Sequence, residues 1–194
     1  MDRLPLSYRA KLYRDTFPQF PDSWPWVETG RWLNAIWVTG NDYRGSGYYG
    51  SYPRGYLPRV LSLFPDRVRT LHVFSGSLPP RPGEVRVDLL PNPDARADVK
   101  ADARHLPFGD RTFDLVLADP PYSSLDAERY GTTMPSRLAV VREIARVLEP
   151  GGYLVWLDLV RPMYRKSELE GVGLIGIVRS TNHRVRLATI FRRR

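Results

Sequence analysis

The sequence predicts an α/β fold with one domain and an N-terminal extension, and the clearest evidence lies from residue 70 onward. There, short apolar runs separated by turns alternate with one long helical stretch, as expected for strands and helices of a layered fold. A chain of 194 residues with 42% hydrophobic content can bury one core of ordinary size. We therefore expect residues 1–69 to pack as an extension on a domain formed by residues 70–194.

Seven strands are expected in this domain. They are Leu71–Phe74, Val85–Asp88, a short strand near Val99, Leu115–Ala118, Tyr153–Leu159, Leu174–Arg179 and Val185–Phe191. Residues 136–148 place apolar side chains on one helical stripe, and Gly151-Gly152 is expected to stop that helix. The last two strands are separated by a loop of hairpin length over residues 180–184, which predicts an antiparallel pair closing a mostly parallel sheet.

The extension differs in composition from the rest of the chain. It holds all but one of the five tryptophans, mixed with Gly and Pro, and shows little clean periodicity. Residues 40–50 have turn chemistry throughout, and the apolar spacing from Tyr56 to Phe64 suits a short helix that ends before Pro65. We expect an irregular, aromatic-rich segment whose tryptophans mostly fill core.

Composition narrows the possible functions. The chain has no cysteine and three scattered histidines, which excludes disulfides and thiolate zinc sites and predicts no metal centre. No run of eighteen apolar residues and no secretory leader pattern is present, so we expect a soluble, cytoplasmic protein without a membrane partner. A net charge of +8 favours a polyanionic partner, because Lys and Arg that neutralise phosphates dominate nucleic-acid affinity.

The strongest motif is Asp119-Pro120-Pro121-Tyr122, which directly follows an apolar strand. Ligands of open parallel sheets bind beyond the carboxyl ends of the strands, where this tetrapeptide is expected to lie. Two prolines remove two backbone donors and leave a rigid turn that presents acceptors, which suit an amino group. Tyr122 offers a face on which an extruded base could stack. The motif alone is also compatible with a simple strand-ending turn.

Three segments in order resemble the class I S-adenosylmethionine-dependent methyltransferases, and the tetrapeptide resembles their Asp-Pro-Pro-Tyr group, which includes adenine-specific DNA methyltransferases. The segments are residues 101–114, the tetrapeptide, and residues 147–154, and the resemblance covers roughly residues 70–192. It implies a Rossmann-like, seven-stranded, mostly parallel sheet and S-adenosyl-L-methionine as cofactor. It also implies that Asp119 and the Pro120 carbonyl accept hydrogen bonds from the target amino group while Tyr122 stacks on the base.

The same resemblance assigns the cofactor residues. Asp88 is similar to the acid that binds the ribose hydroxyls, and Asp102, with the backbone of Ala103, to the group that holds the cofactor adenine. The full expectation is a catalytic set, a cofactor set and a substrate set. The catalytic set is Asp119, Pro120, Pro121 and Tyr122; the cofactor set is Phe74, Ser75, Gly76, Ser77, Asp88, Asp102, Ala103 and Asp119; the substrate set is Tyr122, Ser123 and Tyr49.

The chain departs from the family at the first motif. Where the family has an acidic residue and several glycines, residues 72–80 keep only Gly76, and the prolines that follow leave little room for the usual helix before the next strand. Two explanations stand: defective cofactor binding, or a remodelled site in which the loop with Gly45, Gly47, Tyr49 and Gly50 covers the methionine end of the cofactor. The retention of Asp88, Asp102 and Asp119 favours remodelling.

The sequence therefore predicts a methyltransferase that acts on an exocyclic amino group of a nucleic-acid base, with N6 of adenine in DNA as the leading target. Amino methylation of RNA, at guanine N2 or adenine N6, is the alternative within enzymes. A non-catalytic nucleic-acid-binding protein that kept the fold is the alternative outside them, and small-molecule or protein-glutamine methylation is a further one. Base identity, sequence context and oligomeric state do not follow from the motif.

Overall fold

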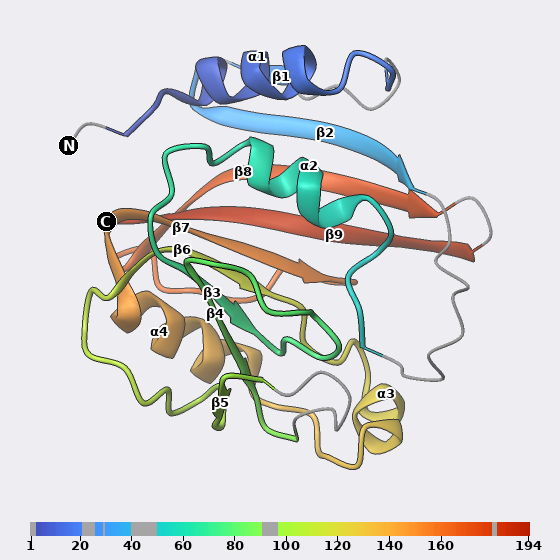
Figure 1. Cartoon of the computed structure of the whole chain (residues 1–194), viewed down its shortest axis with the longest axis vertical. Coiled ribbons are helices and arrows are strands. Elements are labelled where there is room, and N and C mark those ends of the chain that lie inside the picture. Colours follow the sequence, from blue (N-terminus) through green and yellow to red (C-terminus); the bar gives the residue numbers. More distant parts are fainter. Residues whose placement is uncertain (1–2, 21–25, 29, 40–49, 91–96, 180–181) are drawn as a thin grey trace.

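The computed structural model describes the chain except for residues 1–2, 21–25, 29, 40–49, 91–96 and 180–181, and all strands join one sheet (Figure 1). The strands are β1 Trp26–Glu28, β2 Trp32–Thr39, β3 Thr70–Val73, β4 Glu84–Asp88, β5 Val99–Lys100, β6 Phe113–Ala118, β7 Leu148–Asp158, β8 Leu169–Arg179 and β9 Asn182–Arg193. The helices are α1 Leu6–Thr16, α2 Tyr56–Ser62, α3 Ser124–Arg129 and α4 Arg137–Val147.

The sheet has the order β1-β2-β8-β9-β7-β6-β3-β4-β5. Strands β5, β4, β3, β6 and β7 are parallel, and β9 lies antiparallel between β7 and β8. All seven predicted strands are present, and the mostly parallel sheet with its antiparallel C-terminal hairpin is confirmed. The hairpin strands are longer than expected, because β9 already begins at Asn182.

The expectation of an irregular N-terminal extension is corrected by the structure. Strand β2 pairs in parallel with β8 from Leu33 to Thr39, and β1 pairs antiparallel with β2, so the extension adds two strands to the main sheet. Leu33, Ala35 and Trp37 face the core, whereas Ile36 and Val38 are about half exposed. Two neighbouring exposed apolar residues blur the inside-outside alternation that normally reveals such a strand.

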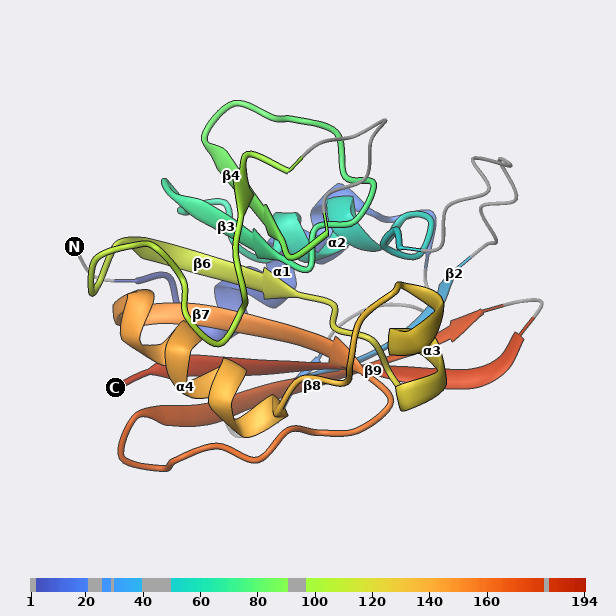
Figure 2. The ribbon, with the colours of Figure 1, turned by 90° about the horizontal axis from the view of Figure 1, so that it is seen from below.

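Helices cover both faces of the sheet (Figure 2). Helices α1 and α2 pack on one face through a cluster that contains Tyr13, Trp37 and Tyr56, and the Tyr13 and Trp37 rings stack with centroids 5.3 Å apart. Helix α4 packs on the other face through Val141, Ile144 and neighbouring apolar residues. The central strand β6 is buried along its whole length, as a parallel strand covered on both sides must be.

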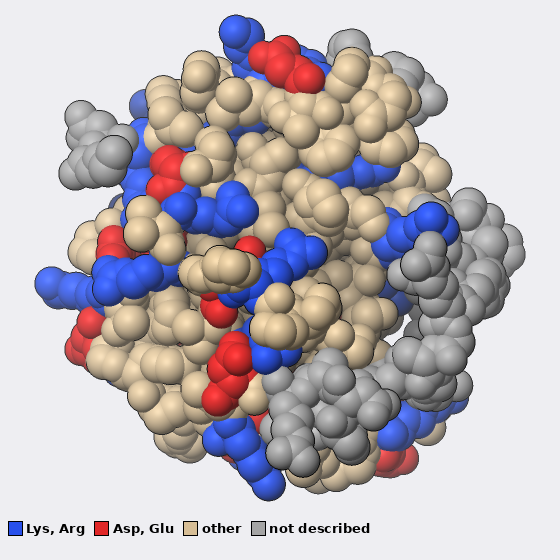
Figure 3. Space-filling model, viewed as in Figure 1, with Lys and Arg blue, Asp and Glu red and all other residues tan. Residues whose placement is uncertain are grey.

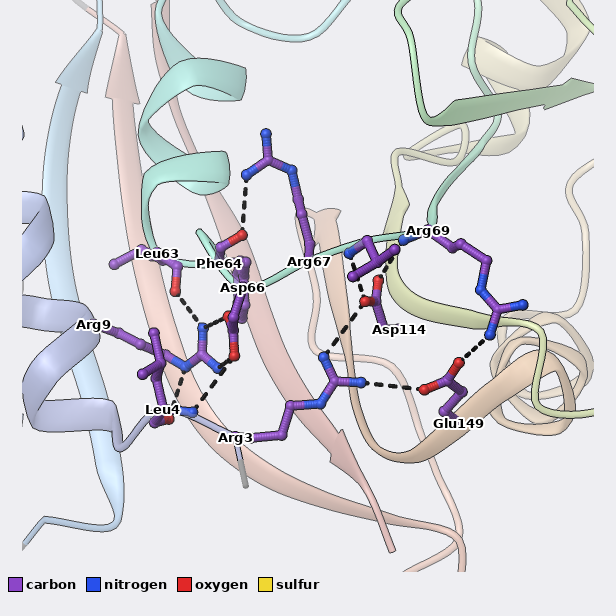
Figure 4. Close-up of polar contacts among 11 residues, drawn as sticks. Arg3, Leu4, Arg9, Leu63, Phe64, Asp66, Arg67, Arg69, Asp114 and Glu149 are labelled. Carbon is purple, nitrogen blue, oxygen red and sulfur yellow. Dashed lines mark hydrogen bonds and ion pairs between the residues drawn. The ribbon is translucent and has the colours of Figure 1, made fainter. Parts of the chain in front are cut away.

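A buried arginine ties α1 to the segment that follows α2 (Figure 4). The Arg9 guanidinium on α1 donates hydrogen bonds of 2.7 and 2.8 Å to the Asp66 carboxylate and one of 2.8 Å to the Leu63 carbonyl. It also lies over the rings of Phe64 and Tyr153, at 5.2 and 4.8 Å from their centroids. Because the buried charge is both paired and hydrogen-bonded, α1 is held in a single position against the sheet.

Two local expectations are corrected. The glycine pair after α4 does not end that helix: β7 already begins at Leu148, and Gly151-Gly152 lie within it, where the pairing with β6 shifts register. A Cβ on Gly152 would lie 3.0 Å from the carbonyl oxygens of Asp114 and Glu149, so the bulge needs a glycine there. Residues 124–129, which lie outside the one helix expected in the domain, form α3. As expected, residues 74–83 between β3 and β4 contain no helix.

Candidate functional site

A cavity of about 380 Å³ opens at the carboxyl ends of β3, β4 and β6. Its walls come from segments far apart in the sequence, and Figure 2 shows α3 at the end of the sheet to which the arrowheads of β6 and β7 point. The lining comprises residues 50–52, 73–76, 87–90, 101–104, 119–122, 132–133, Asp126, Tyr130, Pro135 and Arg186. The structure thus brings nearly all of the predicted cofactor and catalytic residues around one space.

At one end of the cavity lies Asp88, the last residue of β4. Its Oδ2 accepts a hydrogen bond of 2.8 Å from the Gly76 amide and its Oδ1 one of 3.3 Å from the Leu90 amide. Burial raises the pKa of this carboxyl, and the amide hydrogen bonds oppose that effect. A carboxylate has about four acceptor positions, so Asp88 keeps capacity for two further donors such as vicinal hydroxyls.

The turn after β3 is completed by the N-terminal segment. The Gly50 carbonyl accepts hydrogen bonds from the amide (2.9 Å) and the hydroxyl (3.2 Å) of Ser77. A Cβ on Gly76, whose φ is +53°, would lie 1.9 Å from that carbonyl oxygen. The remaining glycine of the first motif is therefore required by the approach of another backbone. Phe74 also has a positive φ, of 61°, a strained value for an aromatic residue.

Of the loop expected to cover the cofactor, Gly50 lines the cavity, while Gly45, Gly47 and Tyr49 lie outside the described residues. The Ser75 hydroxyl is buried and has no hydrogen-bond partner within the part of the chain that the structure describes. An unsatisfied hydroxyl in the wall of a cavity is costly unless a ligand or water meets it. Ser77 lies behind the turn and is not part of the cavity wall.

Asp102 lines the same cavity with Ala103, but its carboxylate is engaged by Arg104. It accepts hydrogen bonds from the Arg104 amide (2.8 Å), Nε (3.0 Å to each oxygen) and Nη2 (2.6 Å). These bonds hold the pKa of Asp102 below its usual value. For Asp102 to receive the cofactor adenine, the partly exposed Arg104 side chain must turn away.

At the other end of the cavity, Asp119 and Tyr122 contact each other. The Tyr122 hydroxyl donates a hydrogen bond of 2.6 Å to Asp119 Oδ1. Burial raises the pKa of Asp119 to about 7, against the lowering effects of the Tyr122 hydrogen bond and the nearby Arg186 charge. Pro120 and Pro121 also line the cavity, so the whole tetrapeptide faces it. Near neutral pH this carboxyl is poised between an acceptor and a proton carrier.

An ion pair between Arg137 and the buried Asp158 holds the tetrapeptide in place. Arg137 Nη2 donates a hydrogen bond of 3.1 Å to the Tyr122 carbonyl, while its guanidinium pairs with Asp158 at 2.6 Å. Asp158 is fully buried and also accepts from Trp156 Nε1 at 3.2 Å. Ser123, predicted to bind substrate, is not in the cavity wall, because its hydroxyl accepts from the Asp126 amide and caps α3.

Two contacts at the cavity were not predicted from the sequence. Tyr52 lines it, and its hydroxyl is 3.2 Å from His72 Nδ1, whose Nε2 is 2.9 Å from Glu84 Oε2. His72 thus links the N-terminal segment to β4. Arg186 on β9 lies over the Tyr122 ring at 5.0 Å from its centroid. No local pattern marks either contact, because both join residues from distant parts of the chain.

These residues fit S-adenosylmethionine. Asp88 offers acceptors for ribose hydroxyls, the unsatisfied Ser75 hydroxyl can meet a polar group, and both lie in a cavity of the volume expected for a small-molecule site. Within the described residues, no group of three or more His, Cys, Asp or Glu side chains could hold a metal ion. Within those residues too, no helix combines the length and hydrophobicity needed to cross a membrane.

Comparison with known proteins agrees with this geometry. Residues 84–156 match the family described as "Methyltransferase domain". The phthiotriol/phenolphthiotriol dimycocerosates methyltransferase 1 of Mycobacterium ulcerans is 39% identical over 72 residues, which are 37% of this chain and 23% of that protein. The methyltransferase GfsG of Streptomyces halstedii is 43% identical over 60 residues, or 31% of this chain and 18% of that one. The chain therefore matches only about a fifth of the length of these relatives.

Solved structures of low sequence identity are also similar. TrmN from Thermus thermophilus has a TM-score of 0.46 and 20% identity, covering 66% of this chain and 44% of its own. A 1,6-didemethyltoxoflavin-N1-methyltransferase from Burkholderia thailandensis, solved with its substrate and S-adenosylhomocysteine, has a TM-score of 0.48 and 16% identity, covering 69% and 75%.

The strand order and the matched segment lead to one conclusion about the fold. The parallel strands run β5-β4-β3-β6-β7, with an antiparallel strand between β7 and β8, and the methyltransferase match spans β4 to β7. The chain has the class I S-adenosylmethionine-dependent methyltransferase fold, extended at the β8 edge by two strands from its N-terminal segment.

Proposed function

We propose that the protein methylates an exocyclic amino group of a nucleic-acid base, with N6 of adenine in DNA as the leading target. The main support for this proposal is that the Asp119 carboxyl lies in the wall of the same cavity as Asp88, next to Tyr122 and two prolines. S-adenosylmethionine would supply an electrophilic methyl group on its sulfonium. The chain then needs only to place an amino nitrogen in line with that methyl group and to stabilise the developing charge.

The residues divide this work among them. Asp119 and the Pro120 carbonyl accept hydrogen bonds from the two N–H groups of the target, which keeps the nitrogen lone pair directed at the methyl group. As positive charge develops on the nitrogen, the Asp119 carboxylate stabilises it and accepts a proton, which its pKa of about 7 permits. Arg137 and Asp158 hold the tetrapeptide in place through the Tyr122 carbonyl.

The relatives favour a second candidate. One of them is named a phthiotriol/phenolphthiotriol dimycocerosates methyltransferase, so transfer to an acceptor other than a nucleic acid is the alternative. The family match covers residues 84–156, which include Asp88 and the tetrapeptide but neither the Gly50–Tyr52 segment nor Arg186. The matched stretch therefore includes residues proposed for the cofactor and for catalysis, whereas Gly50–Tyr52 and Arg186, which also line the cavity, lie outside it.

Transfer of a tritiated methyl group tests the proposal. The protein is incubated with labelled S-adenosylmethionine and separate pools of DNA, RNA, protein and extracted small molecules, and labelled nucleosides are identified after digestion. We expect label in N6-methyladenine from DNA and no label with the Asp119→Asn variant. Label in an RNA base selects the RNA alternative, label outside nucleic acid selects the second candidate, and no label in any pool contradicts the enzyme assignment.

A further inference from the structure

Arg186 is a cationic side chain of the cavity with no assigned role. It lies on β9 opposite Ile177 of β8, toward the end of the hairpin where the two strands are joined, and it is half-buried. Its guanidinium covers one face of the Tyr122 ring, whose hydroxyl in turn contacts Asp119. It therefore lies on the acceptor side of the cavity, across from the Asp88 end.

The charges around the cavity single out this residue. Two of the lining side chains are cations, Arg104 and Arg186. Arg104 is paired with Asp102 at 2.6 Å, whereas Arg186 has no carboxylate within 4.0 Å among the residues that the structure describes. The Arg186 charge lowers the pKa of Asp119 at the end of β6, and the Asp158 charge on β7 raises it. A half-buried guanidinium without a counter-ion favours an anion.

The shape of the group narrows the choice of anion. A guanidinium presents planar, paired N–H donors that match phosphate or carboxylate oxygens. Because Arg186 lies over one face of the Tyr122 ring, a base can stack only on the opposite face. On the face of the molecule shown in Figure 3, Lys and Arg side chains lie beside Asp and Glu rather than forming one basic surface. Arg186 places a cation in the wall of the cavity itself.

We propose that Arg186 binds the phosphate of the nucleotide whose base enters the cavity, so that the acceptor is recognised as a nucleotide and not as a free base or nucleoside. The proposal rests on the proposed function and deepens it. Arg186 acts as a substrate-binding residue, and its contact with Tyr122 couples capture of the phosphate to the ring on which the base stacks.

A substrate series tests this contact. Methyl transfer is measured for 2′-deoxyadenosine, its 5′-monophosphate and a single-stranded oligonucleotide, with the wild type, Arg186→Gln and Arg186→Lys. Arg142→Gln is the matched control, since Arg142 is an exposed arginine on α4 outside the cavity wall. Work at pH 9, about two units above the pKa of Asp119, limits the effect of the lost Arg186 charge on that carboxyl. Calorimetry with S-adenosylhomocysteine follows the cofactor site separately.

We expect the wild type to prefer the monophosphate over the nucleoside by about 10-fold or more in kcat/KM, and Arg186→Gln to bring this ratio close to one. Arg186→Lys should keep part of the preference because it keeps the charge. In oligonucleotide binding, the slope of log K against log salt should fall by about 0.7 for Arg186→Gln, as expected for one lost phosphate contact on a single strand. Arg142→Gln should leave the ratio unchanged.

Several outcomes would overturn the inference. An unchanged monophosphate-to-nucleoside ratio in Arg186→Gln removes the phosphate role even if methylation of nucleic acid is confirmed. A loss of S-adenosylhomocysteine affinity with that ratio intact would assign Arg186 to the cofactor carboxylate. If no polynucleotide, nucleotide or nucleoside accepts a methyl group, the proposed function fails and this inference with it.

Discussion

The Tyr122 hydroxyl donates a hydrogen bond of 2.6 Å to Oδ1 of Asp119, so the two functional groups of the tetrapeptide are coupled. The sequence suggests separate roles for them, stacking for the ring and hydrogen-bond acceptance for the carboxyl. In the structure, the phenol also stabilises the charged form of the carboxylate and thereby opposes the effect of burial. The proton affinity of Asp119 therefore depends on the residue three positions later.

Replacing Tyr122 by Phe tests this coupling. The ring face survives, but the pKa of Asp119 should rise further, because the hydrogen bond that favours the carboxylate is lost. We expect the midpoint of the pH–rate profile to move to higher pH, with activity recovering at about pH 9. Tyr122→Ala should in addition weaken base capture by about 1 to 3 kcal/mol. Identical pH profiles for Phe and wild type would show that the phenol does not control Asp119.

Asp119→Asn should lower methyl transfer by about 100-fold or more, because the neutral amide cannot stabilise developing positive charge or take a proton. Binding of S-adenosylhomocysteine should persist, which calorimetry can measure. Asp110→Asn, at a largely exposed acid that pairs with Arg146, is a control for loss of one negative charge. Near wild-type turnover of Asp119→Asn would remove the carboxylate from the reaction.

The raised pKa of Asp119 predicts opposite pH dependences for methyl transfer and for the free energy of unfolding. Activity should rise as the pH passes the pKa of about 7, where the carboxylate forms. The pKa of Asp119 in the folded protein lies above that of an ordinary aspartate. The contribution of protonated Asp119 to the free energy of unfolding is therefore full below about pH 4 and is lost as the pH rises through 7. Asp119→Asn should therefore raise the free energy of unfolding at pH 8, on the order of 2 kcal/mol, and have little effect at pH 4. Urea unfolding at the two pH values measures this, and an equal effect at both contradicts the burial argument.

Asp88→Ala should weaken S-adenosylhomocysteine binding by roughly 1.5 to 3 kcal/mol, since charged-acceptor hydrogen bonds to the ribose would be lost. The variant also leaves the Gly76 amide without its acceptor, so the turn after β3 loosens. Asp88→Asn keeps an acceptor for that amide and separates the two effects. Calorimetric affinities equal to wild type in both variants would exclude Asp88 from the cofactor site.

Gly76→Ala should detach the N-terminal segment from the turn, because the new Cβ would lie 1.9 Å from the Gly50 carbonyl oxygen. Gly83→Ala is a matched control: Gly83 also has a positive φ, +76°, but its Cβ would be 3.8 Å from the nearest atom. Both variants carry backbone strain of about 1 kcal/mol. Only Gly76→Ala should lose cofactor affinity as well, measured by calorimetry. Equal cofactor affinities would show that the Gly50 contact does not support the site.

Local sequence patterns were sufficient to predict the fold from β3 to β9. Short apolar runs identify the seven strands from β3 to β9, and Asp88 and Asp119 are placed in one site because parallel strands end at the same edge of a sheet. The proline-rich stretch after Gly76 correctly excludes a helix, since proline lacks the amide that a helix interior needs. Each of these conclusions depends on residues that are close together in the chain.

How distant segments complete the site depends on tertiary contacts that the sequence does not reveal. Pairing of β2 with β8 carries the extension into the main sheet. The fold places Gly50 against Ser77, Tyr52 against His72 and, from the interior strand β9, Arg186 against Tyr122. The free energy of such contacts comes from burying and pairing polar groups across the fold, which leaves no periodic trace in either segment. Residues that make these contacts look like ordinary surface arginines or loop tyrosines until the sheet brings their partners next to them.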